Sequence, residues 1–328
     1  MTTTAAQSTP FELATPARRP RPSRRIALSK PVIYLMLLSY AVMVVYPMFW
    51  LSYTSLKPSS EVFMKPLSLP VHFSWHAAKE ARNEGHLKAY LHENLIAPLE
   101  WSNFSRAWVD GRFGQYFFNS VLITSTTVVV TVFLAAMSAY ALARFVFPGS
   151  RSIYFYFLGG LMIPLQLAIV PLFFELKSMN LLDSLFGLFL VYVGFGFPFS
   201  IFILTVFFRS LPTSLHESAL LDGANEFKAF WHVMLPLARP GLVTVGIFLF
   251  LGNWNEFFVA FICLSGKGSE SLRTLPLGIA NITIVAQYRT DLGVAFAGVV
   301  LMMLPMLIVY IFFQKQLTKG ITAGAVKG

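Results

Sequence analysis

Long apolar runs separated by short polar segments dominate the pattern along the chain. Six of these runs hold about 20 largely apolar residues or more, the length that a helix needs to cross the hydrocarbon core of a bilayer. They cover residues 32–51, 117–142, 153–174, 185–208, 241–264 and 294–313. The pattern therefore predicts an all-α, polytopic membrane protein with six transmembrane helices.

The polar segments divide the rest of the chain. Residues 1–29 are rich in Thr, Pro, Ala and Arg without apolar periodicity, and we expect this tail to be disordered. The first run is longer than the apolar region of a signal peptide, so we interpret it as a retained span. A transmembrane domain over 30–320 follows, with a long polar insert at 52–116, and residues 321–328 form a short tail.

The polar segment 209–240 between the fourth and fifth runs predicts a structured loop. Ser214 and Glu217 have the spacing of a capping box at a helix start. One apolar helical face is expected, made of Leu220, Ala224, Phe227, Trp231 and Met234. Gly223 interrupts this face and predicts a bend, and Pro236 is expected to end the helix.

Composition supports a membrane protein. Of the 328 residues, 56% are hydrophobic and only 12% charged, and the mean hydropathy is +0.64. The formal net charge of +10 could suggest nucleic acid, but no recognition motif accompanies it, and we expect no such partner. The cations instead lie near the ends of the apolar runs. With six spans, the residues on the same side of the membrane as the arginine-rich N-terminal tail include Arg144, Arg151, Arg209, Lys228 and Arg239. This distribution predicts that both termini are cytoplasmic.

Catalytic chemistry is missing from the sequence. It contains no phosphate-binding loop, nucleophile elbow, zinc-protease motif or cysteine cluster, so we expect neither an enzyme nor a cofactor. The single cysteine, Cys263, is expected to be a small buried hydrophobic residue. Four histidines lie within 72–98, but no carboxylate completes a convincing ligand set, so we predict a solvated helix and no metal.

One polar cluster interrupts the fifth run, where ionisable groups are costly. Asn253, Asn255 and Glu256 lie nearer the outer rim of the predicted span than its centre. A place in a translocation pathway and a role in helix packing are both compatible with this position.

The segment 209–240 also carries a family resemblance. Glu217-Ser218-Ala219, three residues, Gly223, nine residues, Val233, one residue and Leu235-Pro236 repeat the spacing of the E-A-A-x₃-G-x₉-I-x-L-P motif. This motif is typical of permease subunits of binding-protein-dependent ABC importers. Ser218 and Val233 are mild departures. Asn119-Ser120, Asn180 to Ser184, Trp254 to Phe257 and the end of the chain, LTKGITAGAVKG, resemble carbohydrate permeases of the MalG type.

The resemblance implies a fold, partners and a location. It implies the type I ABC importer permease fold with a cytoplasmic coupling helix, in a bacterial inner membrane. A second homologous permease, two ATPase subunits and an extracytoplasmic solute-binding protein would be the partners, beside the lipid bilayer. The solute would be a sugar, with polyols or glycerol phosphate as the alternative. A secondary carrier working alone would need no structured docking loop, and a structural membrane protein is the remaining class.

Site residues follow from the same resemblance. The coupling residues would be Glu217, Ser218, Ala219, Asp222, Gly223, Leu235 and Pro236. The C-terminal ATPase contact would include Gly320, Thr322, Gly324, Lys327 and Gly328. The loop before the last span would touch the binding protein through Asn281, Gln287 and Tyr288.

Overall fold

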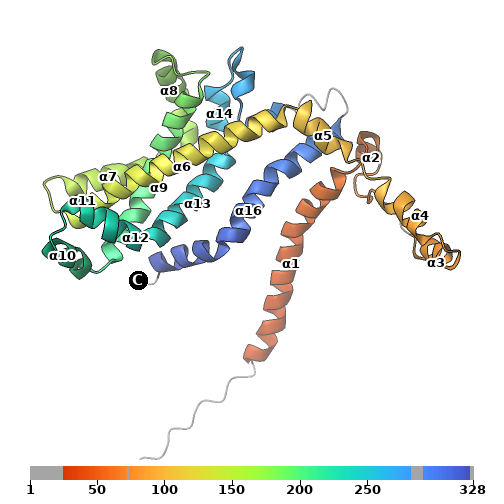
Figure 1. Ribbon diagram of the computed structural model, residues 1–328, viewed down its shortest axis with the longest axis horizontal. Coiled ribbons are helices and arrows are strands. Elements are labelled where there is room, and N and C mark those ends of the chain that lie inside the picture. The colour runs from red at the N-terminus through yellow and green to blue at the C-terminus, as the bar shows by residue number, and fades with distance from the viewer. Residues whose placement is uncertain (1–24, 72–73, 282–290, 326–328) are drawn as a thin grey trace, which may run out of the picture. The chain divides into compact units, whose positions relative to one another are not determined.

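The structure of the chain, a computed structural model, describes residues 25–71, 74–281 and 291–325 (Figure 1). Helices and loops make up all of these residues, and no strand occurs among them. Four helices are long and apolar enough to cross a membrane, and the number rises to six if each of two bent helix pairs counts as one span. The predicted all-α fold class is thus confirmed, with four to six candidate spans.

Four predicted runs correspond to single helices that extend beyond the predicted limits. These are α1 (Arg25–Thr54), α6 (Phe113–Arg144), α9 (Leu185–Ser210) and α16 (Leu292–Ala325). Helix α1 begins inside the segment that we expected to be a disordered tail, and residues 1–24 lie outside the described part. The chain separates into two compact units at Phe49 and Trp50, and the paragraphs below concern the second unit.

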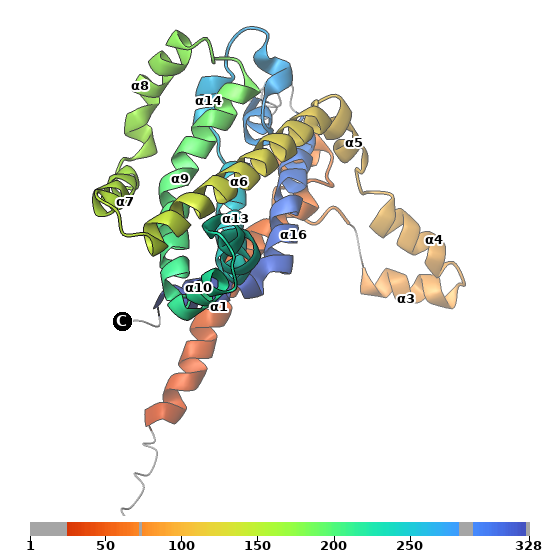
Figure 2. The ribbon, with the colours of Figure 1, turned by 60° about the vertical axis from the view of Figure 1, so that its left-hand side comes forward.

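The third run is broken, contrary to the expectation of one continuous helix. It forms α7 (Ser150–Gly160) and α8 (Leu165–Ser178), which meet at 98° (Figure 2). Pro164 adopts an extended conformation before α8, with φ −63° and ψ 130°. Because proline has no N–H and disfavours helical geometry in the residue before it, the helix cannot continue through this point.

The fifth run is broken as well. Helix α13 (Arg239–Trp254) ends before three non-helical residues, and the short α14 (Phe258–Cys263) follows. The Glu256 carboxylate accepts hydrogen bonds from the amides of Val259 (2.8 Å) and Ala260 (3.0 Å). These bonds occupy N–H groups that the first turn of α14 would otherwise leave unpaired.

Helices α6, α9 and α13 pack side by side at the centre of the second unit (Figures 1 and 2). Small residues of α6 allow close approach, since Ala135, Ala136 and Ala139 are fully buried. A methyl group on Gly196 of α9 would lie 3.0 Å from Leu249 of α13. Small residues at helix contacts are typical of membrane proteins, where van der Waals packing drives association.

A buried lysine organises the segment after α1. Lys57 is 0% exposed, and its Nζ donates to the carbonyl oxygens of Lys65 (2.9 Å) and Pro66 (3.4 Å) and to the Ser68 hydroxyl (3.3 Å). Its ammonium also lies 5.3 Å from the ring centroid of Tyr53. Burial lowers the pKa of Lys57 below its ordinary value, while the charge of Glu61 opposes this shift. These hydrogen bonds hold residues 57–68 folded around the Lys57 side chain.

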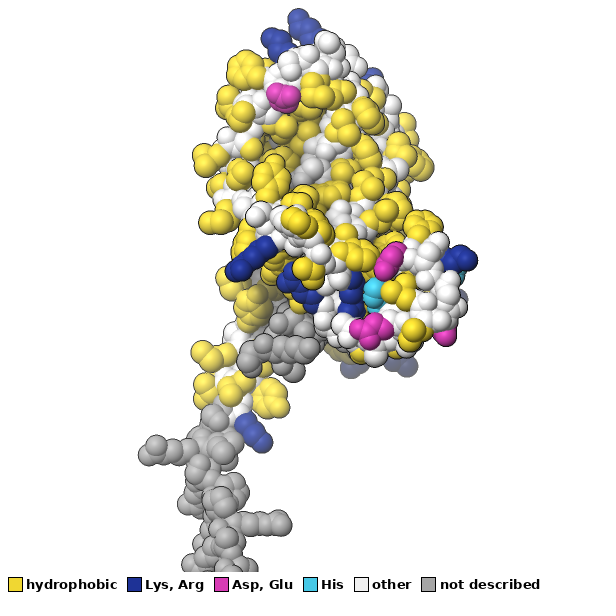
Figure 3. All heavy atoms as spheres, turned by 90° about the vertical axis from the view of Figure 1, so that its left-hand side faces the viewer, with side chains coloured by type: hydrophobic (Ala, Val, Ile, Leu, Met, Phe, Trp, Pro, Cys, Tyr) yellow, Lys and Arg dark blue, Asp and Glu magenta, His cyan; other side chains and the backbone are white. Residues whose placement is uncertain are grey.

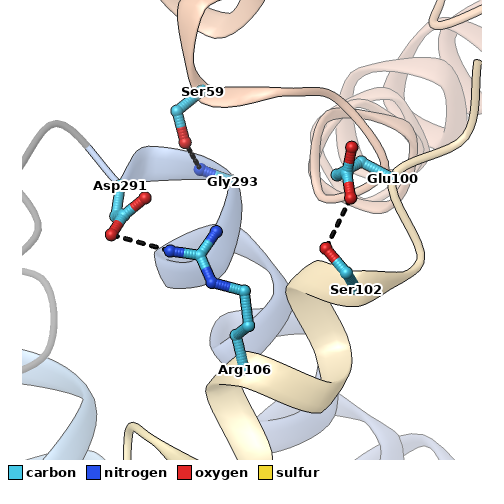
Figure 4. Close-up of polar contacts among 6 residues, drawn as sticks. All are labelled: Ser59, Glu100, Ser102, Arg106, Asp291 and Gly293. Atoms are coloured by element: carbon cyan, nitrogen blue, oxygen red, sulfur yellow. Dashed lines mark hydrogen bonds and ion pairs between the residues drawn. The ribbon is translucent and has the colours of Figure 1, made fainter.

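The same segment is tied to α5 (Ser102–Val109) and α16. The buried Asn103 amide donates to the carbonyl oxygens of Ser55 and Lys57, both at 2.9 Å. Figure 4 shows Arg106 of α5 pairing with Asp291 at 2.9 Å, and the amide of Gly293 donating to Ser59 of α2 (Ser59–Met64). In the same view Ser102 donates to Glu100. These contacts hold the start of α16 against α2 and α5.

The histidine-rich insert forms a small helical unit of its own. It contains α3 (Trp75–Asn83), α4 (Leu87–Leu91) and the π-helical turn η1 (His92–Ile96). His76 pairs with Glu80 (3.2 Å) and His86 with Glu84 (3.4 Å), and all four side chains are exposed. No group of three potential metal ligands occurs among the described residues, although His72 lies outside them.

Candidate functional site

The segment 209–240 folds as a helical elbow rather than as one bent helix. Helix α10 (Thr213–Leu221) leads to a turn, after which come α11 (Glu226–Ala229), the π-helical turn η2 (Phe230–Met234) and α12 (Leu235–Leu237). The bend predicted at Gly223 is present, and this residue has φ +86°. Glycine adopts this left-handed conformation without the steric cost that other residues incur.

The helix starts differ from those expected. The predicted capping box is wrong, because α10 begins at Thr213 after Pro212 and no side chain caps it. Ser214 therefore lies inside the first turn instead of before it. The cap that does form belongs to Asn225, whose side-chain oxygen accepts from the amide of Lys228 at 2.8 Å. Asparagine is a preferred N-cap residue, so the sequence did contain this signal.

Pro236 lies inside α12 and does not end the helical path as expected. Proline removes the N–H that would bond the carbonyl four residues earlier and crowds that carbonyl. The preceding turn widens to π geometry over Phe230–Met234, a common accommodation of such disruption. The chain can thus run continuously from the elbow to α13, from which α11–α12 diverge by 72°.

The buried face of the elbow also differs from the predicted one. Phe230 and Met234 join the core formed by α6, α9 and α13, and Ala229 is buried as well; of these three, only Met234 belongs to the predicted face. Phe227 and Trp231, which we assigned to the apolar face, are 63% and 37% exposed. The second half of the elbow is therefore anchored under the long helices by a face shifted from the one that periodicity indicates.

Glu226 connects the two arms of the elbow to α6. Its carboxylate accepts a hydrogen bond from the Tyr140 hydroxyl at 3.1 Å and lies 2.9 Å from His216 Nε2 of α10. The rings of Tyr140 and His216 also meet edge to face, with centroids 6.1 Å apart. Sequence reasoning missed all three residues, since nothing in their spacing places them together. They fix the orientation of α10 against the end of α6.

Two arginines join the adjacent ends of α6 and α9. Arg144 of α6 donates to the carbonyl oxygens of Phe208 (2.9 Å) and Leu211 (2.8 Å). Arg209 of α9 donates in return to the Leu142 carbonyl at 3.4 Å. Each arginine binds carbonyls near the C-terminal end of the other helix, where unpaired carbonyls and the helix dipole favour a cation.

The predicted coupling residues lie mostly on the open side of this elbow. Glu217, Ser218, Asp222, Gly223 and Pro236 are exposed, Leu235 is half-buried and Ala219 is 9% exposed. The Glu217 carboxylate forms no hydrogen bond or ion pair with any residue that the structure describes. Figure 3 shows acidic and histidine side chains gathered on the protruding part of this face, beside the apolar surface of the long helices.

The other predicted contact residues are only partly described. Gly320, Thr322 and Gly324 belong to the last turns of α16, while Lys327 and Gly328 lie outside the described residues. Asn281 is exposed at the end of a helical stretch over 275–281. Gln287 and Tyr288 lie outside the described part.

The polar cluster of the fifth run is largely engaged in local structure. Glu256 accepts from Tyr192 of α9 (2.9 Å) in addition to the two α14 amides, and Asn255 donates to the Leu251 carbonyl. Asn253 differs, because its buried amide nitrogen has no partner among the described residues. Asn253 and Glu256 line a cavity of about 400 Å³ between α9 and α13, together with Phe195, Phe199 and Phe248. Asn255 does not line it.

Other motif residues hold the loop before 275–281. Asn119 of α6 donates to the carbonyl oxygens of Ser271 (2.8 Å) and Arg273 (3.0 Å), and Ser120 accepts from the amide of Leu275 (2.7 Å). Asp183 accepts from the amide of Gly266 at 2.7 Å. These side chains satisfy backbone groups that a non-helical stretch leaves open. Their place in the family motif is thus explained by structure.

Comparison with known proteins agrees with this geometry. Residues 129–323 match the family model described as binding-protein-dependent transport system inner membrane component. The chain is 38% identical to the diacetylchitobiose uptake system permease protein NgcG of Streptomyces coelicolor, over 90% of this chain and 88% of NgcG. It is 32% identical to the trehalose transport system permease protein SugB of Mycobacterium tuberculosis, over 90% of this chain and 96% of SugB.

A solved structure shares the fold. It is a chain of a bacterial ABC transporter that imports the acidic polysaccharide alginate, with a TM-score of 0.69 and 23% identity. The match covers 90% of this chain and 99% of that chain. Together, the family motif, the helical elbow and the matched residues identify the chain as a member of the family of binding-protein-dependent transport system inner membrane components.

Proposed function

We propose that this chain is the permease subunit of an ABC importer for a carbohydrate, and that the elbow over 209–240 receives the work of separate ATPase subunits. The observation that carries the proposal is the construction of the elbow. Its inner side is anchored to α6 and α9, while Glu217, Ser218 and Asp222 face outward. A rigid, anchored element with free polar groups on its outer side suits docking to a partner.

Each coupling residue has a physical role in this proposal. Glu217 is a free carboxylate that could form charge-assisted bonds with an arginine of the ATPase. Gly223 turns the chain so that α10 projects from the anchored arm. Apart from its two chain neighbours, no described residue has an atom within 4 Å of a methyl group placed there. A partner surface can therefore approach the backbone closely. Leu235 and Pro236 connect the elbow to α13.

The partners and orientation follow from the family and from charge. A second permease, two ATPases and an extracytoplasmic binding protein complete such an importer, with the tail from Gly320 and the loop containing Asn281 as further contacts. The elbow and the cations Arg144 and Arg209 lie at the same end of α6 and α9. Because cations favour the cytoplasmic side, the proposal assigns this end to the cytoplasm, and both termini with it.

A carbohydrate is the favoured solute because permeases for diacetylchitobiose and trehalose are among the relatives. The cavity lined by Asn253, Glu256 and three phenylalanines offers aromatic faces and a polar edge, which suit a sugar ring. Polyols or glycerol phosphate remain the alternative solutes. Uptake assays with a disaccharide panel, a polyol and glycerol phosphate, delivered by the cognate binding protein, decide between them.

The coupling role is tested in the reconstituted transporter with Gly223→Pro and Glu217→Ala. Proline cannot adopt φ +86°, so Gly223→Pro should abolish uptake, and Glu217→Ala should lower it about tenfold through loss of a charge-assisted bond. Gly85→Pro is the matched control, since Gly85 has φ +79° in the exposed insert. Uptake and solute-stimulated ATP hydrolysis are measured together. Normal coupling in Gly223→Pro would refute the docking role.

A further inference from the structure

A second cavity lies at the end of the helices that carries the elbow. It has a volume of about 390 Å³, within the range of about 300–1,000 Å³ that is usual for small-ligand sites. Helices α6, α7 and α9 contribute its lining, which consists of Leu142, Ser150, Arg151, Tyr154, Phe155 and Arg209. Arg209 belongs to the last turn of α9, where the elbow segment begins. The other lining residues lie outside both the coupling elbow and the cavity proposed for the solute.

The cavity is cationic. Neither Arg151 nor Arg209 forms an ion pair among the described residues. The sequence contains no Asp or Glu between Asp110 and Glu175, nor between Asp183 and Glu217, so the three lining helices supply no carboxylate there. Glu226 reaches the end of α6 from the elbow, but it is engaged by Tyr140 and His216. The positive charge of the cavity is thus left without a counterion among the residues that the structure describes.

Aromatic rings hold the two guanidinium groups in place. Arg209 lies 5.2 Å from the ring centroid of Tyr154, and Arg151 lies 5.6 Å from that of Phe155. Arg209 also donates to the Leu142 carbonyl. Stacking on a ring and one hydrogen bond leave most of the five N–H donors of each guanidinium open. Fixed guanidinium groups with open donors match the oxygens of a phosphate group.

The first turn of α7 adds backbone donors. Gly149 precedes this eleven-residue helix with φ +86°, and no side chain caps it. The amides of Arg151 and Ser152 have no acceptor among the described residues. Such amides at a helix start, together with the helix dipole, favour an anion. They lie beside Ser150 and Arg151, which line the cavity.

The surroundings indicate that the anion has an apolar tail. Ile153, Phe155 and Tyr156, in the first two turns of α7, are 43%, 54% and 79% exposed. Figure 3 shows Lys and Arg side chains at the border where the broad apolar surface ends. A soluble phosphate would gain nothing from this apolar surface, whereas acyl chains would cover it. Basic pockets between helices on the cytoplasmic side are suited to anionic lipid headgroups.

We propose that the cavity between α6, α7 and α9 binds the phosphate group of an anionic phospholipid, with Arg151 and Arg209 as its principal ligands. The lipid would then connect α7 to the arginine-linked ends of α6 and α9. This inference does not depend on which solute is carried.

The test measures the phospholipid retained by the purified transporter, with native mass spectrometry after exchange into detergent. Arg151→Gln removes one open guanidinium and should reduce retained phosphatidylglycerol about tenfold, the effect of one charge-assisted contact. Arg151→Lys keeps the charge and should retain an intermediate amount. Arg239→Gln is the matched control, because Arg239 is an exposed cation at the start of α13. Equal losses in Arg151→Gln and Arg239→Gln would overturn the proposal.

A second measurement separates the sources of the phosphate. In nanodiscs, phosphatidylglycerol should raise the melting temperature of the wild type over that in phosphatidylcholine alone, and should not do so for Arg151→Gln. If inorganic phosphate or glycerol phosphate stabilises the wild type equally well, the site takes a free anion and the lipid proposal is wrong. If Arg151→Gln loses the ATPase subunits while lipid retention is unchanged, the cavity serves a protein carboxylate instead, which also contradicts it.

Discussion

At the scale of single residues, many polar side chains in this protein form hydrogen bonds with backbone groups that breaks in the helices would otherwise leave unpaired. Glu256 illustrates this, since its carboxylate serves the start of α14 and the Tyr192 hydroxyl at once. The sequence indicated either transport or packing for this glutamate, and its three bonds favour packing. Asn253 lines the cavity, and its buried amide nitrogen has no hydrogen-bond partner among the residues that the structure describes.

Gly293 offers a prediction at this scale. A methyl group there would lie 2.6 Å from the Asn103 amide and 2.7 Å from the Lys57 carbonyl, both in the buried cluster around Lys57. Gly293→Ala should therefore destabilise the protein by about 1–3 kcal/mol, the usual cost of overpacking. Thermal unfolding in detergent measures the effect. Gly252→Ala is the control, since a methyl group there would meet no described residue within 4 Å outside its chain neighbours and the nearby backbone of its own helix. A larger loss of stability in Gly252→Ala would contradict the packing argument.

At the scale of elements, apolar length predicted the helices but not their breaks. Pro164 interrupts the third run between α7 and α8, yet Pro198 and Pro305 lie inside the continuous helices α9 and α16. A proline in a membrane helix can be tolerated when neighbouring groups satisfy the freed carbonyl, and the sequence alone does not reveal those groups. The break after Trp254 contains no proline, and depends on a glutamate whose bonds appear only in the folded chain.

The elbow shows the same division between what was predictable and what was not. The apolar pattern and Gly223 predicted a helical segment with a bend, and both are present. The coupling roles implied by the motif stay a prediction. The N-cap that does form, at Asn225, has a residue type typical of caps, but it was not predicted from the sequence. The link between His216, Glu226 and Tyr140 joins residues up to 86 positions apart, and no local pattern encodes such a contact.

The insert formed by α3, α4 and η1 gives the prediction at the scale of elements. Its polar contacts are largely internal, as when Tyr90 hydrogen-bonds the backbone of Ser74 at 3.0 Å. Replacing residues 76–92 with a short Gly/Ser linker should leave membrane insertion and uptake within about twofold of wild type, because surface insertions cost little. Quantitative uptake assays test whether the replacement is tolerated. The same assays with a chelator test the expectation that the insert binds no metal. Loss of uptake on chelation would establish a metal role.

At the scale of the whole molecule, the unit that begins at Trp50 contains one packed helical centre and two assemblies held by polar contacts. Helices α6, α9 and α13 form the centre, and the cluster around Lys57 joins α2, α5 and α16. The elbow lies at the end of α6 and α9 marked by Arg144 and Arg209. The sequence predicted that Arg144 and Arg209 lie on the same side of the membrane, and the helix ends that carry them do lie together.

The tail supplies a prediction at this scale. Deleting residues 320–328 should leave the packed centre intact but weaken association with the ATPase subunits, if the tail contacts them as in related importers. Co-purification of the ATPase and its hydrolysis rate in the assembled transporter are the measurements. A truncated chain that assembles and supports regulated uptake like wild type would refute the contact.

The reciprocal arginine bonds at the ends of α6 and α9 have a mechanical consequence. Arg144 holds two carbonyls of the α9 terminus and Arg209 holds one of α6, so sliding one helix along the other would break all three bonds. In the proposed mechanism, a displacement of the elbow would act on α6 through the hydrogen bond between Glu226 and Tyr140. Tyr140 lies about one turn before Arg144. Helices α6 and α9 would then move together as one rigid body. Because the two helices would not slide along each other, a displacement at the elbow would be transmitted to the far ends of both.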